Sequence, residues 1–307
     1  KTADDVVCSK TSDPVSITVL PQPTALVTSG DQSLCLGANN TTSFTVSGDY
    51  SGGTPLWVSS SGSFVIQSTS YSNGKATATV VATGTGSATV TLQTSNATTA
   101  CNTASSSATL TVTPLPATTI TAGGATTFCS GGSVVLSAPE SSTYTYQWLK
   151  NNTAIAAPEG TAREYTATTA GDYKVRVTDT ATGCVATTAT ATTITVNPQP
   201  TVSSASASPA SKCVGSNNTT IFDLSGSVAN GSPSGSVVST TGNAIVSNIS
   251  SPNTTSTQVT VNGIGTVTMR LTSSSTVASC NDAYKNVTIT VNPYPVADAG
   301  PDLVKCS

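Results

Sequence analysis

Apolar and polar residues alternate along much of this chain in short runs. Residues 75–81 have the sequence Lys-Ala-Thr-Ala-Thr-Val-Val, and residues 86–92 and 265–271 alternate in the same way. A period of two predicts β-strands with one buried and one exposed face. Gly84 and Gly263 stand just before two of these runs and predict the turns that lead into them. The pattern therefore predicts an all-β protein.

The centre of the chain has shorter runs with more aromatic residues. Four of them predict successive strands. They are Ser133-Val-Val-Leu-Ser, Tyr144-Thr-Tyr-Gln-Trp-Leu, Glu164-Tyr-Thr-Ala-Thr and Gly171-Asp-Tyr-Lys-Val-Arg-Val-Thr. Thr and Val, which are abundant throughout the chain, favour the pleated conformation of strands.

A proline motif closes such runs at four places, and finding this repeat decides the domain organisation. The copies are Val-Leu-Pro-Gln-Pro (19–23), Val-Thr-Pro-Leu-Pro (112–116), Val-Asn-Pro-Gln-Pro (196–200) and Val-Asn-Pro-Tyr-Pro (291–295). Their spacing of 84 to 95 residues suits β-sandwiches of about 100 residues. Proline ends a central strand and makes a short, extended linker. The expected linker residues are Pro21, Pro23, Pro114, Pro116, Pro198, Pro200, Pro293 and Pro295. The fold class that follows is a linear array of tandem immunoglobulin-like β-sandwiches.

The repeat divides the chain into three whole domains and two partial ones. Residues 39–48 match residues 217–226 closely, so the first and third whole domains form one type (type A) and the shorter middle domain another (type B). The expected domains are 1–21 (the last strand of a preceding domain), 22–115 (type A), 116–199 (type B), 200–294 (type A) and 295–307 (the first strand of a following domain). The chain is therefore expected to be a segment of a longer array.

Charge and residue types argue against several classes of function. Only 8% of the residues are charged, and the net charge of −3 does not suit nucleic acid, whose phosphates need clustered Lys and Arg. No apolar run reaches the ~18 residues of a membrane span. The chain has no His and its 14 carboxylates are scattered, so a Ser or Cys nucleophile would lack its usual base. We expect no enzyme activity, metal, cofactor, nucleic-acid partner or membrane insertion.

Eight cysteines occur in phase with the repeat, and we expect disulfides made in an oxidising, extracellular compartment. They are Cys8, Cys35, Cys101, Cys129, Cys184, Cys213, Cys280 and Cys306. The simplest pairing lies within domains, as Cys35–Cys101, Cys129–Cys184 and Cys213–Cys280, and leaves Cys8 and Cys306 for outside neighbours. In an immunoglobulin topology, however, these positions lie at opposite ends of a sandwich. Pairs across the domain junctions, Cys35 with Cys184 and Cys129 with Cys280, are therefore the alternative.

The few aromatic residues predict the cores of the domains. Trp57 and Trp148 follow the first cysteine of their domains by 22 and 19 residues, which suits the core position on immunoglobulin strand C. Phe44, Tyr173 and Phe222 also lie in predicted strands. The alternative is that Trp57 lies in a Gly-rich loop and stacks on a sugar.

Four segments of the middle domain resemble a known family. They are Tyr-Gln-Trp (146–148), Ala-Gly-Asp-Tyr-Lys-Val-Arg-Val-Thr-Asp (170–179), Gly-Cys (183–184) and Ile-Thr-Val-Asn-Pro (194–198). They look like the immunoglobulin-like repeats of large Bacteroidetes surface proteins, among them SprB-type gliding adhesins and other substrates of type IX secretion. The resemblance implies a secreted protein of the bacterial cell surface, with a role in adhesion or gliding motility. It also implies O-glycosylation at an Asp-Ser/Thr-apolar motif, here Thr180.

These observations favour a structural stalk segment that holds a distal adhesive region away from the cell. Its partners are then neighbouring immunoglobulin-like domains of the same chain. One alternative is the subunit of an extracellular filament joined through its terminal half-domains. Another is a module that binds surface polysaccharide, which predicts a solvent-facing aromatic cluster.

Overall fold

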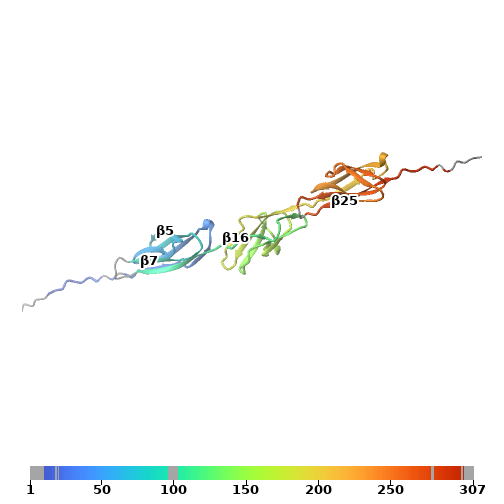
Figure 1. Ribbon diagram of the computed structural model, residues 1–307. Helices are drawn as coiled ribbons and strands as arrows, with labels where there is room; N and C mark the ends of the chain where they lie inside the picture. Colours follow the sequence, from blue (N-terminus) through green and yellow to red (C-terminus); the bar gives the residue numbers. More distant parts are fainter. Residues whose placement is uncertain are drawn as a thin grey trace, which may run out of the picture. The chain divides into compact units, whose positions relative to one another are not determined.

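The computed structural model shows an all-β chain, which confirms the predicted fold class (Figure 1). The structure describes residues 10–17, 19, 21–95, 103–277, 280–298 and 300. The described strands form six sheets, and these make three immunoglobulin-like sandwiches. The chain separates into two compact units, Lys1–Ala117 with Ser141–Thr145 and Val177–Ala186, and Thr118–Glu140 with Tyr146–Arg176 and Thr187–Ser307.

The first sandwich has two four-stranded sheets, in the orders β1-β3-β6-β5 and β2-β8-β7-β4. Its elements are β1 (Thr24–Val27), β2 (Gln32–Cys35), the short 3-10 helix η1 (Ala38–Asn40), β3 (Thr42–Ser51), β4 (Thr54–Ser59), β5 (Phe64–Ser72), β6 (Lys75–Ala82), β7 (Gly86–Ser95) and β8 (Ala104–Thr113). Neighbouring strands are antiparallel except β2 and β8, which run parallel. This is the immunoglobulin order, with strands A, B, E and D in one sheet and C, F and G in the other.

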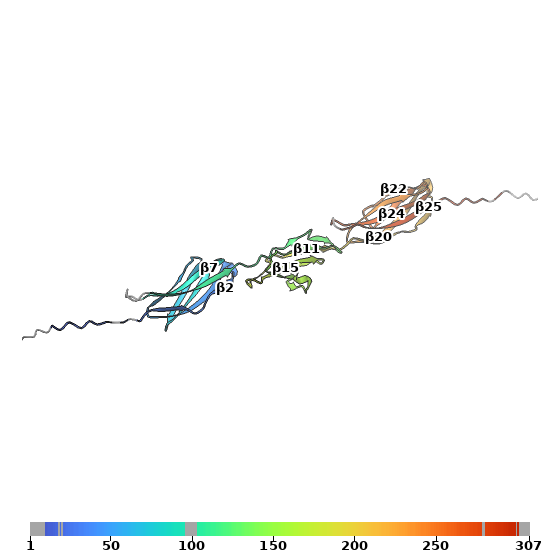
Figure 2. The same ribbon diagram turned by 90° about the horizontal axis from the view of Figure 1, so that it is seen from below.

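Alternation along these strands builds the core of the first sandwich, whose strands β2 and β7 are labelled in Figure 2. In β6 every second residue is buried, while Lys75 and Thr77 are exposed. Phe44, Val80, Val90 and Leu110 come from four strands and are at most 1% exposed. Because each fully buried side chain of this size stabilises by about 1.5–3 kcal/mol, the alternation accounts for the packing of the two sheets.

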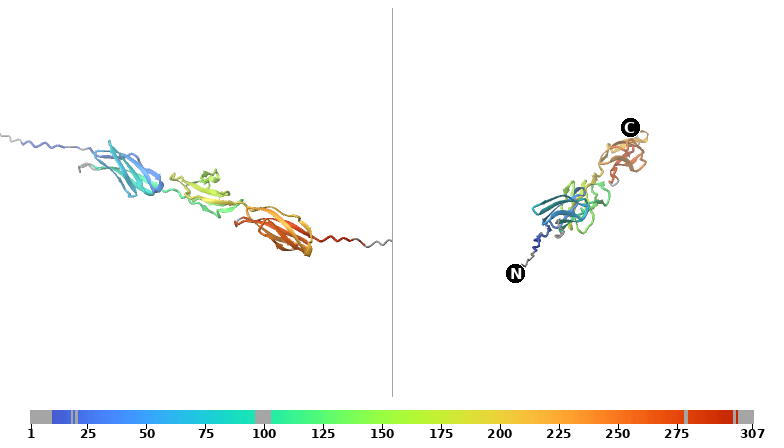
Figure 3. Two further views of the ribbon diagram at one scale, coloured as in Figure 1. Left: turned by 90° about the horizontal axis from the view of Figure 1, so that it is seen from above. Right: turned by 90° about the vertical axis from the view of Figure 1, so that its left-hand side faces the viewer.

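The third sandwich, coloured orange in Figure 3, repeats this topology. Its strand orders are β18-β20-β23-β22 and β19-β25-β24-β21. Its elements are β18 (Thr201–Ala207), β19 (Ser211–Cys213), η3 (Ser216–Asn218), β20 (Thr219–Ala229), β21 (Ser232–Thr240), β22 (Ile245–Ile249), β23 (Ser256–Asn262), β24 (Gly265–Ser274) and β25 (Ala283–Asn292). Strand β19 is parallel to β25, as β2 is to β8. Phe222, Val259 and Ile289 are fully buried in its core.

The sequence match between the first and third sandwiches extends to the turns η1 and η3. Before η1, the N–H of Gly37 donates to Thr42 Oγ1 (3.0 Å), and before η3 the N–H of Gly215 donates to Thr220 Oγ1 (3.1 Å). The middle residue of each turn is an Asn with a positive φ, of 56° and 57°. Asn tolerates this left-handed conformation better than most residues. The two matching sequences therefore fold alike.

The middle sandwich is smaller, with the sheets β14-β11-β9 and β10-β17-β15-β12-β13, and with β16 paired to β15. Its elements are β9 (Thr121–Ala122), β10 (Thr127–Cys129), β11 (Val134–Ser137), β12 (Tyr144–Lys150), β13 (Thr153–Ala154), η2 (Glu159–Thr161), β14 (Glu164–Ala167), β15 (Gly171–Asp179), β16 (Val185–Thr187) and β17 (Thr192–Asn197). The four strands predicted here correspond to β11, β12, β14 and β15. Strand β10 again runs parallel to the last strand, β17.

An aromatic cluster fills the core of the middle sandwich. The ring centroid of Tyr165 lies 6.0 Å from that of Trp148 and 5.6 Å from that of Tyr173. The indole Nε1–H of Trp148 donates to the carbonyl of Ala162 (2.9 Å), and the hydroxyl of Tyr173 donates to the carbonyl of Thr169 (2.9 Å). The second bond, from a Tyr near the start of strand F to backbone just upstream, is the tyrosine corner of immunoglobulin sandwiches. Burial is the main cause that raises the pKa of Tyr165 above its ordinary value.

Candidate functional site

The first cysteine of each sandwich has the same place in the fold. Cys35, Cys129 and Cys213 each end a short strand that runs parallel to the last strand of the sandwich. In register, Cys35 stands opposite Thr113, Cys129 opposite Asn197 and Cys213 opposite Asn292. Each opposite residue is followed directly by the first proline of a proline motif. The first cysteine therefore lies where the chain leaves the sandwich, at the joint to the next one.

A backbone hydrogen bond holds this arrangement in all three sandwiches. The N–H of the residue after the cysteine donates to the carbonyl of the residue before the proline. These bonds run from Leu36 to Thr113 (2.9 Å), from Ser130 to Asn197 (2.8 Å) and from Val214 to Asn292 (2.8 Å). Because the bond is made by backbone atoms, it places the cysteine at the joint whatever the neighbouring side chains are.

The second cysteine of a sandwich lies in the connection before its last strand. Cys184 stands between β15 and β16, where its carbonyl accepts the N–H of Asp179 (2.9 Å), and it is fully buried. Cys280 stands between β24 and β25, where its N–H donates to Val277 (2.9 Å), and it is 8% exposed. Cys101, Cys8 and Cys306 lie outside the described residues.

Two disulfides join cysteines of successive sandwiches. Cys35 pairs with Cys184, and Cys129 pairs with Cys280, with Cα atoms 5.6 and 5.4 Å apart. Each pair lies inside one of the two compact units. The expected pairing within domains is therefore wrong for these four cysteines, and the alternative pairing across junctions is the one present.

The length of the last strand explains why pairing within a sandwich fails. In the third sandwich Cys213 stands opposite Asn292, the final residue of β25, whereas Cys280 precedes the first residue of that strand. Ten residues of antiparallel strand span about 34 Å, but the Cα atoms of a disulfide lie within about 7 Å. Cys213 is exposed and makes no disulfide among the described residues. Cys280, the second cysteine of the same sandwich, is bonded to Cys129 instead.

The bridges close long loops. The bonded cysteines are 149 and 151 residues apart in sequence, and each loop includes a joint. In the chain-entropy model, a bridge that closes a loop of this size stabilises the folded state by about 5 kcal/mol relative to the same chain without the bridge. At the first joint the hydroxyl of Thr113 also lies 3.0 Å from the sulfur of Cys184. Thr113, which stands opposite Cys35, thus contacts the cysteine of the next sandwich that Cys35 is bonded to.

The two prolines of a motif differ in burial. The first prolines, Pro21, Pro114, Pro198 and Pro293, are all exposed. The second prolines Pro23, Pro116 and Pro200 are buried, and each stands just before a sandwich begins. Pro295 is exposed. Between described sandwiches, the first proline thus follows the end of one sandwich, and the second is buried just before the next one begins.

The predicted core aromatics lie inside the sandwiches. Trp57 is on β4 and Trp148 on β12, both strand C, and they are 3% and 0% exposed. Phe44 on β3, Phe222 on β20 and Tyr173 on β15 are at most 1% exposed. The alternative that placed Trp57 in a loop as a sugar platform is wrong, since its ring faces the core. Its Nε1 has no acceptor among the described protein groups.

Thr180, the candidate O-glycosylation residue, lies in an exposed turn after β15. Its hydroxyl donates to the carbonyl of Thr143 (2.8 Å). The preceding Asp179 accepts the N–H of Ala181 (3.0 Å). Hydrogen bonding by the Thr143 side chain, followed by this backbone bond, holds the pKa of Asp179 below its ordinary value. The turn is ordered and open to solvent, and the modification stays a prediction.

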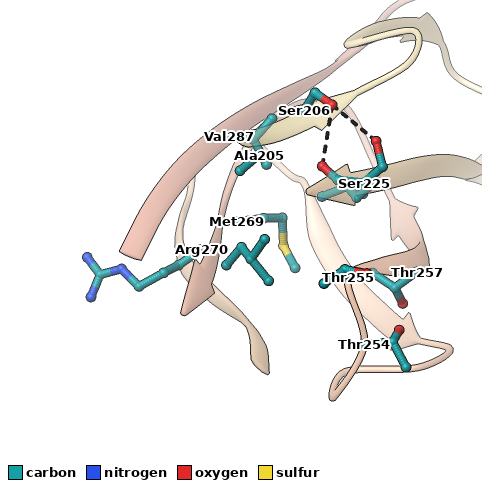
Figure 4. A pocket seen from close by; sticks show the side chains of 11 residues that line it. Ala205, Ser206, Ser225, Thr254, Thr255, Thr257, Met269, Arg270 and Val287 are labelled. Carbon is teal, nitrogen blue, oxygen red and sulfur yellow. Dashed lines mark hydrogen bonds between the residues drawn. The ribbon is translucent and has the colours of Figure 1, made fainter. Parts of the chain in front are cut away.

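A small cavity opens in the third sandwich, shown in Figure 4. It is lined by Leu224, Met269 and Leu271, with Ser206 and Ser225 at its rim. The space inside is about 30 Å³, which suits a few water molecules at most. The guanidinium of Arg270 extends away from it and stacks on the ring of Tyr284, 3.9 Å from the ring centroid. The cavity is therefore a packing gap between the sheets rather than a ligand pocket.

The described part of the chain holds no group of three or more His, Cys, Asp or Glu side chains that could bind a metal ion. None of its helices has the length and apolar character needed to cross a membrane. The disulfide-linked joints are thus the feature on which function can be argued.

Comparisons with known proteins give likenesses of fold. No protein-family model and no curated protein matches the chain. Among solved structures it is similar to the I67–I69 fragment of the titin I-band, with a TM-score of 0.47 and 15% identity over 89% of this chain and 97% of that one. It is also similar to the D1–D4 ectodomain fragment of ICAM-5 (TM-score 0.39, 9% identity, 90% and 78% covered) and to the full ectodomain of mouse nectin-like molecule 4 (0.40, 14%, 87% and 99%). The fold itself is assigned from the strand order of each sandwich.

Proposed function

We propose that this chain is a structural stalk segment of a long extracellular bacterial surface adhesin. The observation that carries the proposal is the pair of disulfides that join successive sandwiches, Cys35–Cys184 and Cys129–Cys280. A bridge inside a sandwich stabilises that sandwich alone. A bridge between sandwiches limits how far they can separate, which is the property that a load-bearing stalk needs.

Composition and chemistry support the same role. Disulfides persist in oxidising compartments, which supports a location outside the reducing cytosol. Thr-rich, sparsely charged strands suit a surface that stays soluble and resists proteases. The assignment to a bacterial surface, to gliding motility and to type IX secretion rests on the resemblance of residues 146–148, 170–179, 183–184 and 194–198 to Bacteroidetes repeats. The stalk itself is proposed to be non-catalytic, with its adhesive region elsewhere.

Electron microscopy of native material, released from cells without reducing agent, tests this role. A denaturing gel of the same sample gives the chain mass. Beaded strings whose chain mass accounts for their length are expected. Long filaments assembled from chains of about 30.4 kDa would instead identify a polymer subunit and overturn the stalk proposal.

A further inference from the structure

Cys213 is exposed, has a free thiol in the structure and ends β19. Its two counterparts, Cys35 and Cys129, are both bonded to the second cysteine of the following sandwich. We propose that Cys213 forms the next such bridge, to the cysteine that precedes the last strand of a further sandwich in the same polypeptide. The inference does not rest on the stalk role, because it requires only that another sandwich follows the third.

The geometry at Cys213 matches that at the two bonded positions. All three cysteines end strands parallel to the last strand, opposite the residue before a proline. The N–H of Val214 donates to Asn292 at 2.8 Å, and the corresponding bonds at the bonded positions are 2.9 and 2.8 Å. Since backbone atoms fix this placement, Cys213 presents its thiol at the third joint as its counterparts do at the first and second.

The third sandwich is followed by the same proline motif as the two bridged joints. Val-Asn-Pro-Tyr-Pro (291–295) repeats Val-Asn-Pro-Gln-Pro (196–200) at four of five positions. In the two bridged joints this motif leads directly into the next sandwich. A sandwich after Val-Asn-Pro-Tyr-Pro would supply the partner of Cys213.

The repeat identifies which cysteine the partner is. The two bridges span 149 and 151 residues, which places the partner about 150 residues after Cys213 and beyond Ser307. Cys306 is nearer, but it follows its proline motif as Cys129 and Cys213 follow theirs, so it is a first cysteine. Neither of the two bridges joins one first cysteine to another. The partner is thus a second cysteine.

Formation of the bond follows ordinary thiol–disulfide exchange. The thiolate of Cys213 attacks the disulfide of an oxidising dithiol–disulfide protein, forms a mixed disulfide and releases one thiolate of that protein. The thiolate of the partner cysteine then attacks the sulfur of Cys213, and the second thiolate leaves. The two cysteines lose two protons, and two electrons pass to the oxidising protein, which leaves as a dithiol. Because Cys213 is exposed, it can react with that protein without unfolding.

Disulfide mapping of the native full-length protein tests the proposal. Free thiols are alkylated with iodoacetamide before unfolding, and the protein is then digested with trypsin without reductant. Cleavage after Lys212 and Arg270 isolates residues 213–270, which contain Cys213 alone among the cysteines. This peptide is expected unalkylated and linked to a peptide from beyond Ser307, and reduction should release both. The linked peptides containing Cys35 and Cys129 provide the internal control.

Three results would overturn the proposal. The first is Cys213 alkylated in the native protein, and the second is a link between Cys213 and Cys306. The third is a link between two chains, seen as a doubled mass without reductant that Cys213→Ser removes. Because Cys213 is exposed, this variant is expected to keep the third sandwich folded, with unchanged hydrogen exchange in β20 and β24. A failure here leaves the microscopy result unaffected, so the two proposals fail separately.

Discussion

The middle sandwich and the two outer ones solve the same packing problem differently. The outer cores are mainly aliphatic and are built by long alternating strands such as β7 and β24. The middle core depends on the contacts of Trp148, Tyr165 and Tyr173 within shorter strands. The joints, by contrast, have one geometry throughout. Core composition can therefore change between repeats while the position of the cysteine at the joint cannot, because a bridge needs its two Cα atoms within about 7 Å.

The largest expected effect concerns the joints. A specific protease site introduced at exposed Leu115 would cut the chain between the first and middle sandwiches. The cut protein should still migrate as one band without reductant, because Cys35–Cys184 bypasses the cut. The double variant Cys35→Ser, Cys184→Ser should separate completely into two bands.

The matched control for that experiment removes the other bridge. With Cys129→Ser and Cys280→Ser, the cut protein should remain one band. Separation of the cut protein with all its cysteines present would contradict the pairing described above.

Trp148→Ala should be the most damaging change to the middle core. It removes a fully buried indole and its bond to Ala162, at a cost of about 3–5 kcal/mol in the free energy of unfolding. Hydrogen exchange followed by mass spectrometry should show lost protection in β12 and β15, with β3 and β7 unchanged. Loss of protection in the first sandwich as well would mean that the sandwiches unfold together.

The two tryptophans should respond differently to Phe. Trp148→Phe loses the bond to Ala162 and leaves that carbonyl without its partner, whereas Trp57→Phe removes an Nε1–H that has no described acceptor. We expect Trp148→Phe to cost about 1–2 kcal/mol more than Trp57→Phe. Hydrogen exchange in β12 of the Trp148 variant and in β4 of the Trp57 variant, followed by mass spectrometry across a denaturant series, measures the two costs. Equal costs would show that the bond from Trp148 to Ala162 is unimportant.

The tyrosine corner should contribute less. Tyr173→Phe keeps the ring and removes the bond to Thr169, so a loss of about 1 kcal/mol is expected. Tyr284→Phe, at a residue that is 57% exposed, serves as the control and should change nothing measurable. A loss at Tyr284 as large as that at Tyr173 would show that the effect is not specific to the tyrosine corner.

The smallest effect should come from Asp179. Its pKa is lowered in the folded state, so its stabilising contribution is present above the ordinary carboxyl pKa of about 4 and disappears as pH falls through the folded value. Asp179→Asn should therefore lower the melting temperature slightly at pH 6 and by less at pH 2.5. A difference that grows on acidification would have the wrong sign.

Strand periodicity predicted much of this fold, and only part of the site. The alternation in residues 75–81 and the position of Trp148 identified β6 and strand C, because both patterns are local. Strands of two to four residues, such as β9, β10 and β19, are too short to show a period. The bridges could be narrowed only to two alternatives, since pairing of Cys35 with Cys184 depends on two folded sandwiches meeting. The tyrosine corner of Tyr173 was missed, although its place near the start of strand F was a usable signal.

The crossed bridges change the route by which tension would travel through the chain. Between Cys35 and Cys280 the shortest covalent path runs through one disulfide to Cys184, backward along the chain to Cys129, and through the other disulfide. That path contains only the residues from 129 to 184, so even with every strand unravelled it extends to about 200 Å. The same span without bridges could reach about 850 Å. Under load, the proline-containing joints would be slack. The middle sandwich would be pulled between Cys184, near its C-terminal end, and Cys129, near its N-terminal end, so the force would run against the chain direction.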